Sequence, residues 1–128
     1  MEKILVVDDE PDIRFLIKKI LEKEGYAVLE AEGGEDALEL IKNVVPDLIL
    51  LDVMMPGLDG WETCKRIKTQ KSTKNIVVTM LTAKTADDDK IQALESFKAD
   101  WHISKPINTK TLLDTVEWLL KTPPRRDA

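Results

Sequence analysis

Five polar residues stand where apolar runs of this sequence end, and together they could carry out chemistry on a phosphoryl group. Asp8 and Asp9 follow the run ILVV, and Asp52 follows LILL. Thr82 closes the run VVTML, and Lys105 comes directly after WHIS. The carboxyl ends of parallel strands lie along one edge of a sheet, so we expect these side chains to converge there.

Three carboxylates held close together repel one another, so such a cluster needs positive charge nearby. A divalent cation is the natural choice, and oxygen ligands without His or Cys suit Mg²⁺ better than Zn²⁺. Lys105 would add a second positive charge, and the Thr82 hydroxyl could contact a phosphoryl oxygen. A carboxylate can attack phosphorus, and the transfer depends mainly on positioning and charge neutralisation. Asp52 stands alone and is the candidate nucleophile, while Asp8 and Asp9 are candidate metal anchors.

Each of these residues also has an ordinary local explanation. The acidic run before Pro11 could simply favour the start of a helix. Asp52 comes before MMPG and could belong to a turn. Thr82 alone carries little information, and a lone lysine such as Lys105 usually lies in solvent. Their joint placement at the ends of four predicted strands is what favours a phosphoryl site.

The composition is that of a single globular domain. The chain has 128 residues, of which 43% are hydrophobic and 34% are charged. A net charge of −5 argues against a nucleic-acid-binding surface, which usually needs a basic face. Cys64 is the only cysteine and can form no disulfide within the chain, which fits a cytoplasmic location. No signal peptide or membrane-spanning run is predicted, so we expect no membrane contact.

Short apolar runs alternate with longer amphipathic runs along the chain. The predicted strands are Ile4–Val7, Ala27–Glu30, Leu48–Leu51, Ile76–Leu81 and Trp101–Ser104. The predicted helices are Asp12–Glu24, Glu35–Asn43, Gly60–Gln70, Ala86–Phe97 and Asn108–Lys121. In the first helix the apolar residues recur with helical spacing, and Gly25 provides a C-terminal stop. Trp61 and Trp118 fall on apolar helix positions and are expected in the core.

Five strand–helix units in series predict a parallel sheet with helices on both faces. The second and fifth strands are the more polar ones and suit the sheet edges. We therefore expect an α/β fold: a doubly wound five-stranded parallel sheet of order 2-1-3-4-5, in a flavodoxin-like three-layer sandwich. Ligands of such sheets bind where the strand order reverses, here between the first and third strands. Residues 1–121 would form this domain, and residues 122–128 would be a C-terminal tail or the start of a linker.

The chain also resembles the chemotaxis-type receiver domain of two-component response regulators over essentially its whole length. The matching stretches are, in order, ILVVDDEPDIR, PDLILLDVMMPGLDGWE, VVTMLTAKT and SKPI. The resemblance implies a signalling module that takes a phosphoryl group from a histidine kinase or phosphotransfer protein onto Asp52. Such a module catalyses only its own phosphorylation and dephosphorylation. Its helix 4–strand 5–helix 5 surface then changes to control an output partner protein, and a homodimer is one possible assembly.

The same resemblance implies roles at the metal site. Asp9 and Asp52 would bind Mg²⁺ directly, together with the backbone carbonyl of Met54. Asp8 would hold a metal-bound water. Lys105 would contact a phosphoryl oxygen, and a cis peptide bond to the proline after it would place this lysine.

Two further implied roles concern the switch between states. Thr82 would be the switch hydroxyl, and the backbone N–H of Ala83 would help bind the phosphoryl group. The sequence departs from the family pattern in FKADWHISKPI, where His102 replaces the usual Tyr or Phe that partners the switch threonine. Trp101 is also unusual, and we expect it to serve packing or partner contact rather than chemistry.

Three other functions fit parts of the sequence. A phosphatase of the haloacid-dehalogenase type needs Asp-x-Asp on the nucleophile strand, but Met54 stands at the second position. A flavin carrier needs a hydroxyl-rich loop after the first strand, where this chain has acids. A phosphorylation-independent interaction scaffold stays open because the switch region is altered. No DNA-binding or catalytic domain follows, so we expect a stand-alone receiver or one cut from a larger protein.

Overall fold

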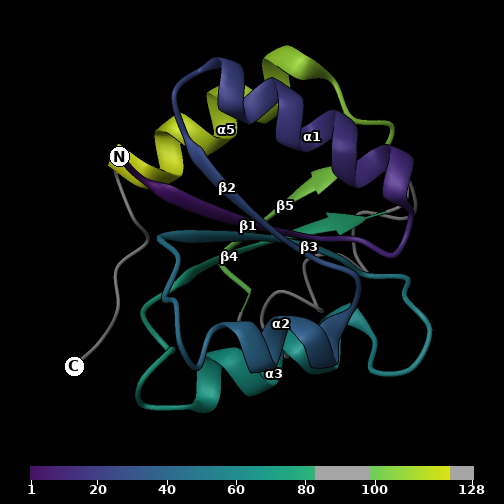
Figure 1. Ribbon diagram of the computed structural model, residues 1–128, viewed down its shortest axis with the longest axis vertical. Coiled ribbons are helices and arrows are strands. Elements are labelled where there is room, and N and C mark those ends of the chain that lie inside the picture. The colour runs from purple at the N-terminus through teal and green to yellow at the C-terminus, as the bar shows by residue number, and fades with distance from the viewer. Residues whose placement is uncertain (83–98, 122–128) are drawn as a thin grey trace.

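A five-stranded sheet lies between two pairs of helices in the computed structural model (Figure 1). The structure describes residues 1–82 and 99–121. The strands are β1 (Lys3–Val7), β2 (Ala27–Ala31), β3 (Leu48–Asp52), β4 (Val77–Thr82) and β5 (Trp101–Ser104). The helices are α1 (Pro11–Lys23), α2 (Gly34–Leu40), α3 (Gly60–Thr69) and α5 (Thr109–Lys121). The predicted helix Ala86–Phe97 and the predicted tail 122–128 lie outside the described residues.

The sheet order is β2-β1-β3-β4-β5 and every pairing is parallel, as predicted. Val7 of β1 lies opposite Leu51 of β3, and Thr82 of β4 lies opposite Ser104 of β5. Because the strands share one direction, the residues that follow them emerge at one edge of the sheet. Helices α1 and α5 cover one face, and α2 and α3 cover the other (Figure 1).

Local capping explains two of the helix ends. Gly25 follows α1 with a φ of 94°, and its N–H donates to the Glu22 carbonyl at 3.0 Å, as expected for a glycine stop. Asn108 caps α5, because its Oδ1 accepts a hydrogen bond from the Thr111 N–H at 3.0 Å. None of the helices within the described ranges is long and apolar enough to cross a bilayer.

The second helix is shorter than the predicted Glu35–Asn43. It ends at Leu40, and residues 41–43 form a turn. In that turn Lys42 donates its N–H to the Glu39 carbonyl at 3.3 Å, and Asn43 donates to Leu40 at 3.1 Å. Bonds that reach back three residues tighten the backbone and end the α-helical ladder.

The sheet separates two hydrophobic cores. Leu5 and Val7 of β1 face the core under α2 and α3, whereas the alternate residues Ile4 and Val6 face the core under α1 and α5. Cys64 is fully buried in the first core, and this burial raises the pKa of its thiol to about 12. The thiol therefore stays protonated at neutral pH and acts as a small apolar side chain.

Trp118 is not a core residue, contrary to expectation, because 47% of it is exposed. The buried stripe of α5 runs through Leu112, Val116 and Leu119. Trp118 points about 100° away from Leu119 around the helix. Its ring packs edge to face on Trp101 of the edge strand β5, with ring centroids 5.1 Å apart. A helix beside an edge strand therefore keeps part of its apolar surface in solvent.

A buried ion pair fixes the entry to β5. Lys68 of α3 donates from Nζ to Asp100 Oδ2 at 2.9 Å and to the Ile76 carbonyl at 2.8 Å. The same carboxylate oxygen accepts the Val78 N–H at 2.7 Å, and the Asp100 N–H donates to the Val78 carbonyl at 2.9 Å. These bonds tie the starts of β4 and β5 to α3, which sets the direction in which β5 runs toward Lys105.

Gly60 lets α3 begin against the backbone at the end of β3. Its N–H donates to the Val53 carbonyl at 3.0 Å. A Cβ at this position would collide with the carbonyl oxygen of Asp52 and would lie 2.7 Å from the Val53 Cα. A side chain here would therefore displace the backbone that carries Asp52.

We predict that Gly60→Ala lowers the free energy of unfolding by about 1–3 kcal/mol, the usual cost of overpacking. Gly33→Ala is the matched control, because Gly33 has an extended φ of −167° and a Cβ there meets nothing within 4 Å. Gly33 is the N-cap of α2, where Ala is less favourable than Gly, so the control should cost no more than about 1 kcal/mol. Urea unfolding followed by circular dichroism measures both, and equal losses would show that the close approach at Gly60 is not tight.

Candidate functional site

Three carboxylates meet at the sheet edge beyond β1 and β3. Asp8, Asp9 and Asp52 each contribute one oxygen that lies within 4.8 Å of the other two. Asp8 is fully buried, Asp52 is 2% exposed, and Asp9 is exposed. The convergence predicted from the strand ends is therefore confirmed, with two buried acids and one acid that faces solvent.

Asp8 is held by three hydrogen bonds. Its N–H donates to the Ala31 carbonyl of β2 at 3.2 Å, and its Oδ1 accepts the Glu10 N–H at 2.9 Å. Its carbonyl accepts from Arg14 Nη1 at 2.7 Å. Within the described ranges Oδ2 is buried without a hydrogen bond, 3.6 Å from Lys105 Nζ. This oxygen is left to bind a cation or a water.

Asp52 and Lys105 form the central ion pair. Lys105 donates from Nζ to Asp52 Oδ1 at 3.0 Å, and the Met54 N–H donates to the same oxygen at 3.3 Å. Burial raises the pKa of Asp52 and the Asp8 charge adds to this, while the Lys105 hydrogen bond offsets only part. For Lys105, burial alone would lower the pKa, but the Asp52 hydrogen bond and the nearby carboxylates raise it overall. The lysine stays charged beside a carboxylate that is more basic than usual.

The other predicted site residues take the following places. Thr82 ends β4, and its buried hydroxyl has no hydrogen bond within the described part of the chain. The Lys105 N–H donates to the Thr82 carbonyl at 2.7 Å, and the Lys105–Pro106 bond is cis, as the resemblance implied. Met54 is 73% exposed beside Asp52. Ala83 lies outside the described residues.

His102 lies on the same face of the sheet as Thr82. Met80 and Thr82 alternate with Leu81 along β4, and His102 is the register partner of Met80. The His102 ring stacks at 6.1 Å on Trp101, which itself contacts Trp118. The residue that stands in for the usual aromatic is therefore two register positions from the Thr82–Ser104 pair, and it stacks on one member of an exposed tryptophan pair.

The donor set fits Mg²⁺. All three converging side chains offer oxygen, and Mg²⁺ is typically bound by one or two carboxylates with waters completing its shell. The unsatisfied Asp8 Oδ2 supplies a buried acceptor, and the exposed Asp9 leaves an open side. Zn²⁺ would favour His or Cys ligands, and neither Cys64 nor His102 belongs to the cluster.

The geometry has a counterpart among known proteins. The sequence matches the family model described as the response regulator receiver domain over residues 4–117. The chain belongs to the response regulator receiver domain family. It is therefore a receiver domain of the two-component systems, and the five-stranded fold agrees with that of the family.

Individual relatives support the same assignment. The chain is 45% identical over 118 residues to the phosphate regulon transcriptional regulatory protein PhoB of Pseudomonas aeruginosa, covering 92% of the chain and 51% of that protein. It is 44% identical over 119 residues to the transcriptional regulatory protein ResD of Bacillus subtilis, covering 93% and 48%. The chain thus spans about half the length of these curated relatives. The Vibrio cholerae chemotaxis response regulator CheY4 has a TM-score of 0.86 at 35% identity, covering 91% of this chain and 97% of that one.

Arg14 is the residue at the site that the sequence did not single out. A basic residue within an amphipathic helix is typical of a solvent-facing position. The side chain is instead 13% exposed and reaches the carbonyl of Asp8. The sequence pattern alone does not predict the contact between Arg14 and the Asp8 carbonyl, because that contact depends on how α1 packs beside β1 and β2.

We predict that Asp52→Asn stabilises the metal-free receiver domain at pH 7.5 by a few degrees in melting temperature. The raised pKa of Asp52 means that the folded state disfavours its ionised form, so wild-type stability falls as pH rises through the folded-state pKa. The Asn variant has no such loss. Melting in EDTA across an acid-to-neutral series measures this, and the gap between the proteins should narrow at acid pH. A gap that does not depend on pH would mean that ionisation of Asp52 is not its cause.

Proposed function

We propose that this receiver domain accepts a phosphoryl group on Asp52 and passes the change to its β5–α5 surface. The observation that carries the proposal is the Asp52 carboxylate itself. It is 2% exposed, lies 3.0 Å from the Lys105 ammonium, and clusters within 4.8 Å of the Asp8 and Asp9 oxygens. A buried, more basic carboxylate beside a fixed cation is suited to attack phosphorus.

The proposed transfer breaks one bond and forms one. An Asp52 oxygen attacks phosphorus while the P–N bond of a phosphohistidine breaks. The imidazole leaves with the bonding electrons and takes up one proton. Lys105 would then pair with the new phosphoryl oxygens. The Thr82 hydroxyl, which has no hydrogen bond within the described residues, and the N–H of Ala83 would donate to them. Each of these groups neutralises or positions charge on the transferred group.

Asp8, Asp9 and Asp52, with the Met54 carbonyl, would hold Mg²⁺ at this site. When bound, Mg²⁺ supplies positive charge that offsets the phosphoryl oxygens. The chain contributes carboxylates that already lie close together, and three hydrogen bonds fix Asp8 among them. Catalysis in this proposal is limited to the domain's own phosphorylation and dephosphorylation.

A protein donor fits the surface next to the site. Phe15 and Leu16 on α1 are 59% and 47% exposed, and Met54 beside Asp52 is 73% exposed. A contiguous patch of exposed apolar side chains marks protein contact, and in this proposal these three residues would contribute to such a patch. We therefore include a histidine kinase or phosphotransfer protein as the donor. The output partner protein, a homodimer and the cytoplasmic location stay predictions.

The decisive test is phosphorylation by acetyl phosphate with Mg²⁺, followed by intact mass. We expect a single phosphoryl adduct that hydroxylamine removes, as it removes an acyl phosphate. Asp52→Asn should abolish the adduct, and Asp9→Ala should reduce it at least tenfold because a metal anchor is lost. An adduct of unchanged yield in Asp52→Asn would refute the assignment. No adduct on a folded wild-type protein would favour the alternative function, a phosphorylation-independent receiver-like scaffold.

The output face carries the second part of the proposal. In this family the switch hydroxyl moves toward the phosphoryl group, and the strand-5 aromatic turns into the space it leaves. His102 is smaller than Tyr, and burial of its ring nitrogens costs more free energy. The exposed Trp101 and Trp118 pair continues from it onto the surface. We propose that coupling to this face is retuned and that Trp101 supplies part of the partner contact.

We predict that His102→Tyr strengthens the response of this face to phosphorylation. Site-to-surface coupling is typically about 1–3 kcal/mol, so a modest gain in the inward state is measurable. Amide chemical shifts of β5 and α5 with and without beryllofluoride, a phosphoryl mimic, measure the response. Larger mimic-induced shifts in His102→Tyr are expected. Equal shifts in the two proteins would mean that His102 serves the switch as well as an aromatic does.

A further inference from the structure

We infer that Arg14 is a positioning residue of the metal site, fixing the main chain of the turn that carries Asp8 and Asp9. The inference rests on the proposed function, since it concerns Mg²⁺ binding at the same carboxylates. In the described part of the chain, Arg14 has no hydrogen bond to a predicted metal-ligand oxygen. It acts through the peptide carbonyl that joins the two acids.

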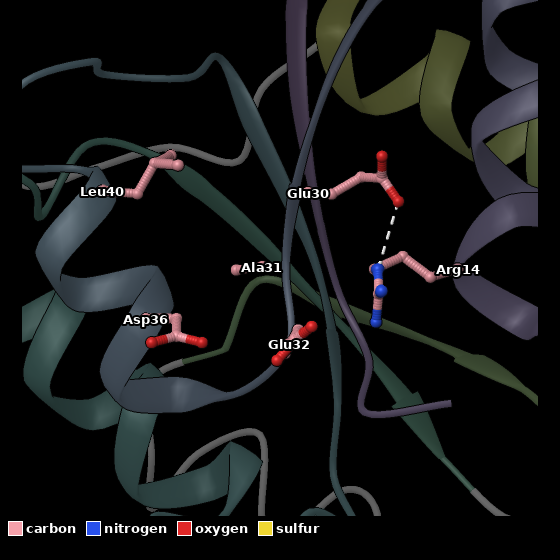
Figure 2. Close-up of a pocket in the computed structure, with 6 residues that line it drawn as sticks. All are labelled: Arg14, Glu30, Ala31, Glu32, Asp36 and Leu40. Carbon is pink, nitrogen blue, oxygen red and sulfur yellow. Dashed lines mark hydrogen bonds and ion pairs between the residues drawn. The ribbon is translucent and has the colours of Figure 1, made fainter. Parts of the chain in front are cut away.

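Arg14 reaches across from α1 to two different elements. Its Nη1 donates to the Asp8 carbonyl at 2.7 Å, and its Nε donates to Glu30 Oε1 on β2 at 3.1 Å. Figure 2 shows the Glu30 carboxylate turned toward the Arg14 guanidinium on the α1 side of β2. The arginine side chain is only 13% exposed. One planar group thus links the edge strand to the acidic turn in a fixed geometry.

The bond to the Asp8 carbonyl is the third hydrogen bond that holds this one residue. The N–H of Asp8 is fixed to Ala31, and its Oδ1 is fixed by the N–H of Glu10. Without Arg14 the carbonyl side of Asp8 would lose the charged partner that orients it. Hydrogen bonds from a charged donor are about twice as strong as neutral ones. The following residue is Asp9, which is exposed, so its placement depends on this backbone.

The surroundings keep the guanidinium in this position. Glu30 also accepts a bond from Lys18 Nζ at 3.1 Å, so it is anchored from two sides. Arg14 lines a pocket of about 330 Å³ whose other charged lining residues are Glu30, Glu32 and Asp36 (Figure 2). Of these acids Glu30 bonds to the guanidinium, whereas Glu32 follows β2 and Asp36 lies on α2.

Lys18 offers a matched control. Whether the Mg²⁺ affinity rises or falls separates an effect of charge from an effect of positioning. Arg14→Met and Lys18→Met each remove one positive charge that pairs with Glu30. By Coulomb's law alone, loss of a cation near the site would tighten the binding of Mg²⁺. Loss of positioning would weaken it instead. Only Arg14→Met removes the bond to the Asp8 carbonyl.

The experiment is calorimetric titration of the metal-free full chain with MgCl₂ for wild type, Arg14→Met, Arg14→Lys and Lys18→Met. Removing a group that orients metal ligands typically costs about 10–100-fold in metal affinity, and we expect about tenfold for Arg14→Met. Lys18→Met should bind as tightly as wild type or more tightly. Arg14→Lys keeps the charge but replaces the planar fork of donors with one nitrogen on a shorter side chain, so an intermediate loss of Mg²⁺ affinity is expected.

Melting of the same proteins in EDTA separates positioning from a merely structural role. If Arg14 only supports the fold, Arg14→Met lowers the melting temperature and leaves the Mg²⁺ affinity unchanged, which overturns the inference. Equal Mg²⁺ affinity of Arg14→Met and Lys18→Met also overturns it. If Arg14→Met does not fold, the Mg²⁺ affinity of Arg14→Lys is compared with that of wild type instead, and an unchanged affinity overturns the inference. A wild-type chain that binds no Mg²⁺ and takes no acetyl-phosphate adduct defeats the proposed function as well, whereas normal labelling with unchanged affinities defeats this inference alone.

Discussion

The structure depends on how three carboxylates are tolerated within 4.8 Å of one another. Two of them are buried, and burial raises the pKa of Asp52. Positive charge from Lys105 at 3.0 Å offsets part of the cost, and hydrogen bonds to backbone groups hold Asp8 in place. In the proposed function, the remaining imbalance would give the site affinity for a cation, because a fully satisfied cluster would have nothing left to bind.

The rest of the fold brings these groups to one place and keeps them there. Parallel register carries the ends of β1, β3, β4 and β5 to one edge. At the far end of the sheet, the Lys68–Asp100 pair fixes where β5 begins. It thereby also fixes the position of Lys105, which follows the end of β5. Gly60 allows α3 to start against the Asp52 backbone without a clash. Stability and function are therefore connected through the same few backbone positions.

The two faces of the sheet carry different residues near β5. The face under α2 and α3 contains Met80 and, through the register, His102. The other face carries Trp101, which packs on Trp118 outside the core. Strand β5 is one of the two edge strands of the sheet, so the switch proposed for Thr82 would have a short route to the surface there. This arrangement suits a domain whose output is a changed surface.

The sheet order, the positions of the strands to within one residue, and the convergence of the acids could be predicted from the sequence. The strand positions follow from the local apolar pattern of each segment, and the sheet order follows from the rules that connect parallel strands. Three features became visible only in the folded chain: Trp118 is 47% exposed, Lys68 is buried against Asp100, and Arg14 reaches the Asp8 carbonyl. Periodicity tells which face of a helix is apolar, but not how far the neighbouring strand extends to cover it. Long charged side chains likewise find partners many residues away, and the sequence pattern does not encode those distances.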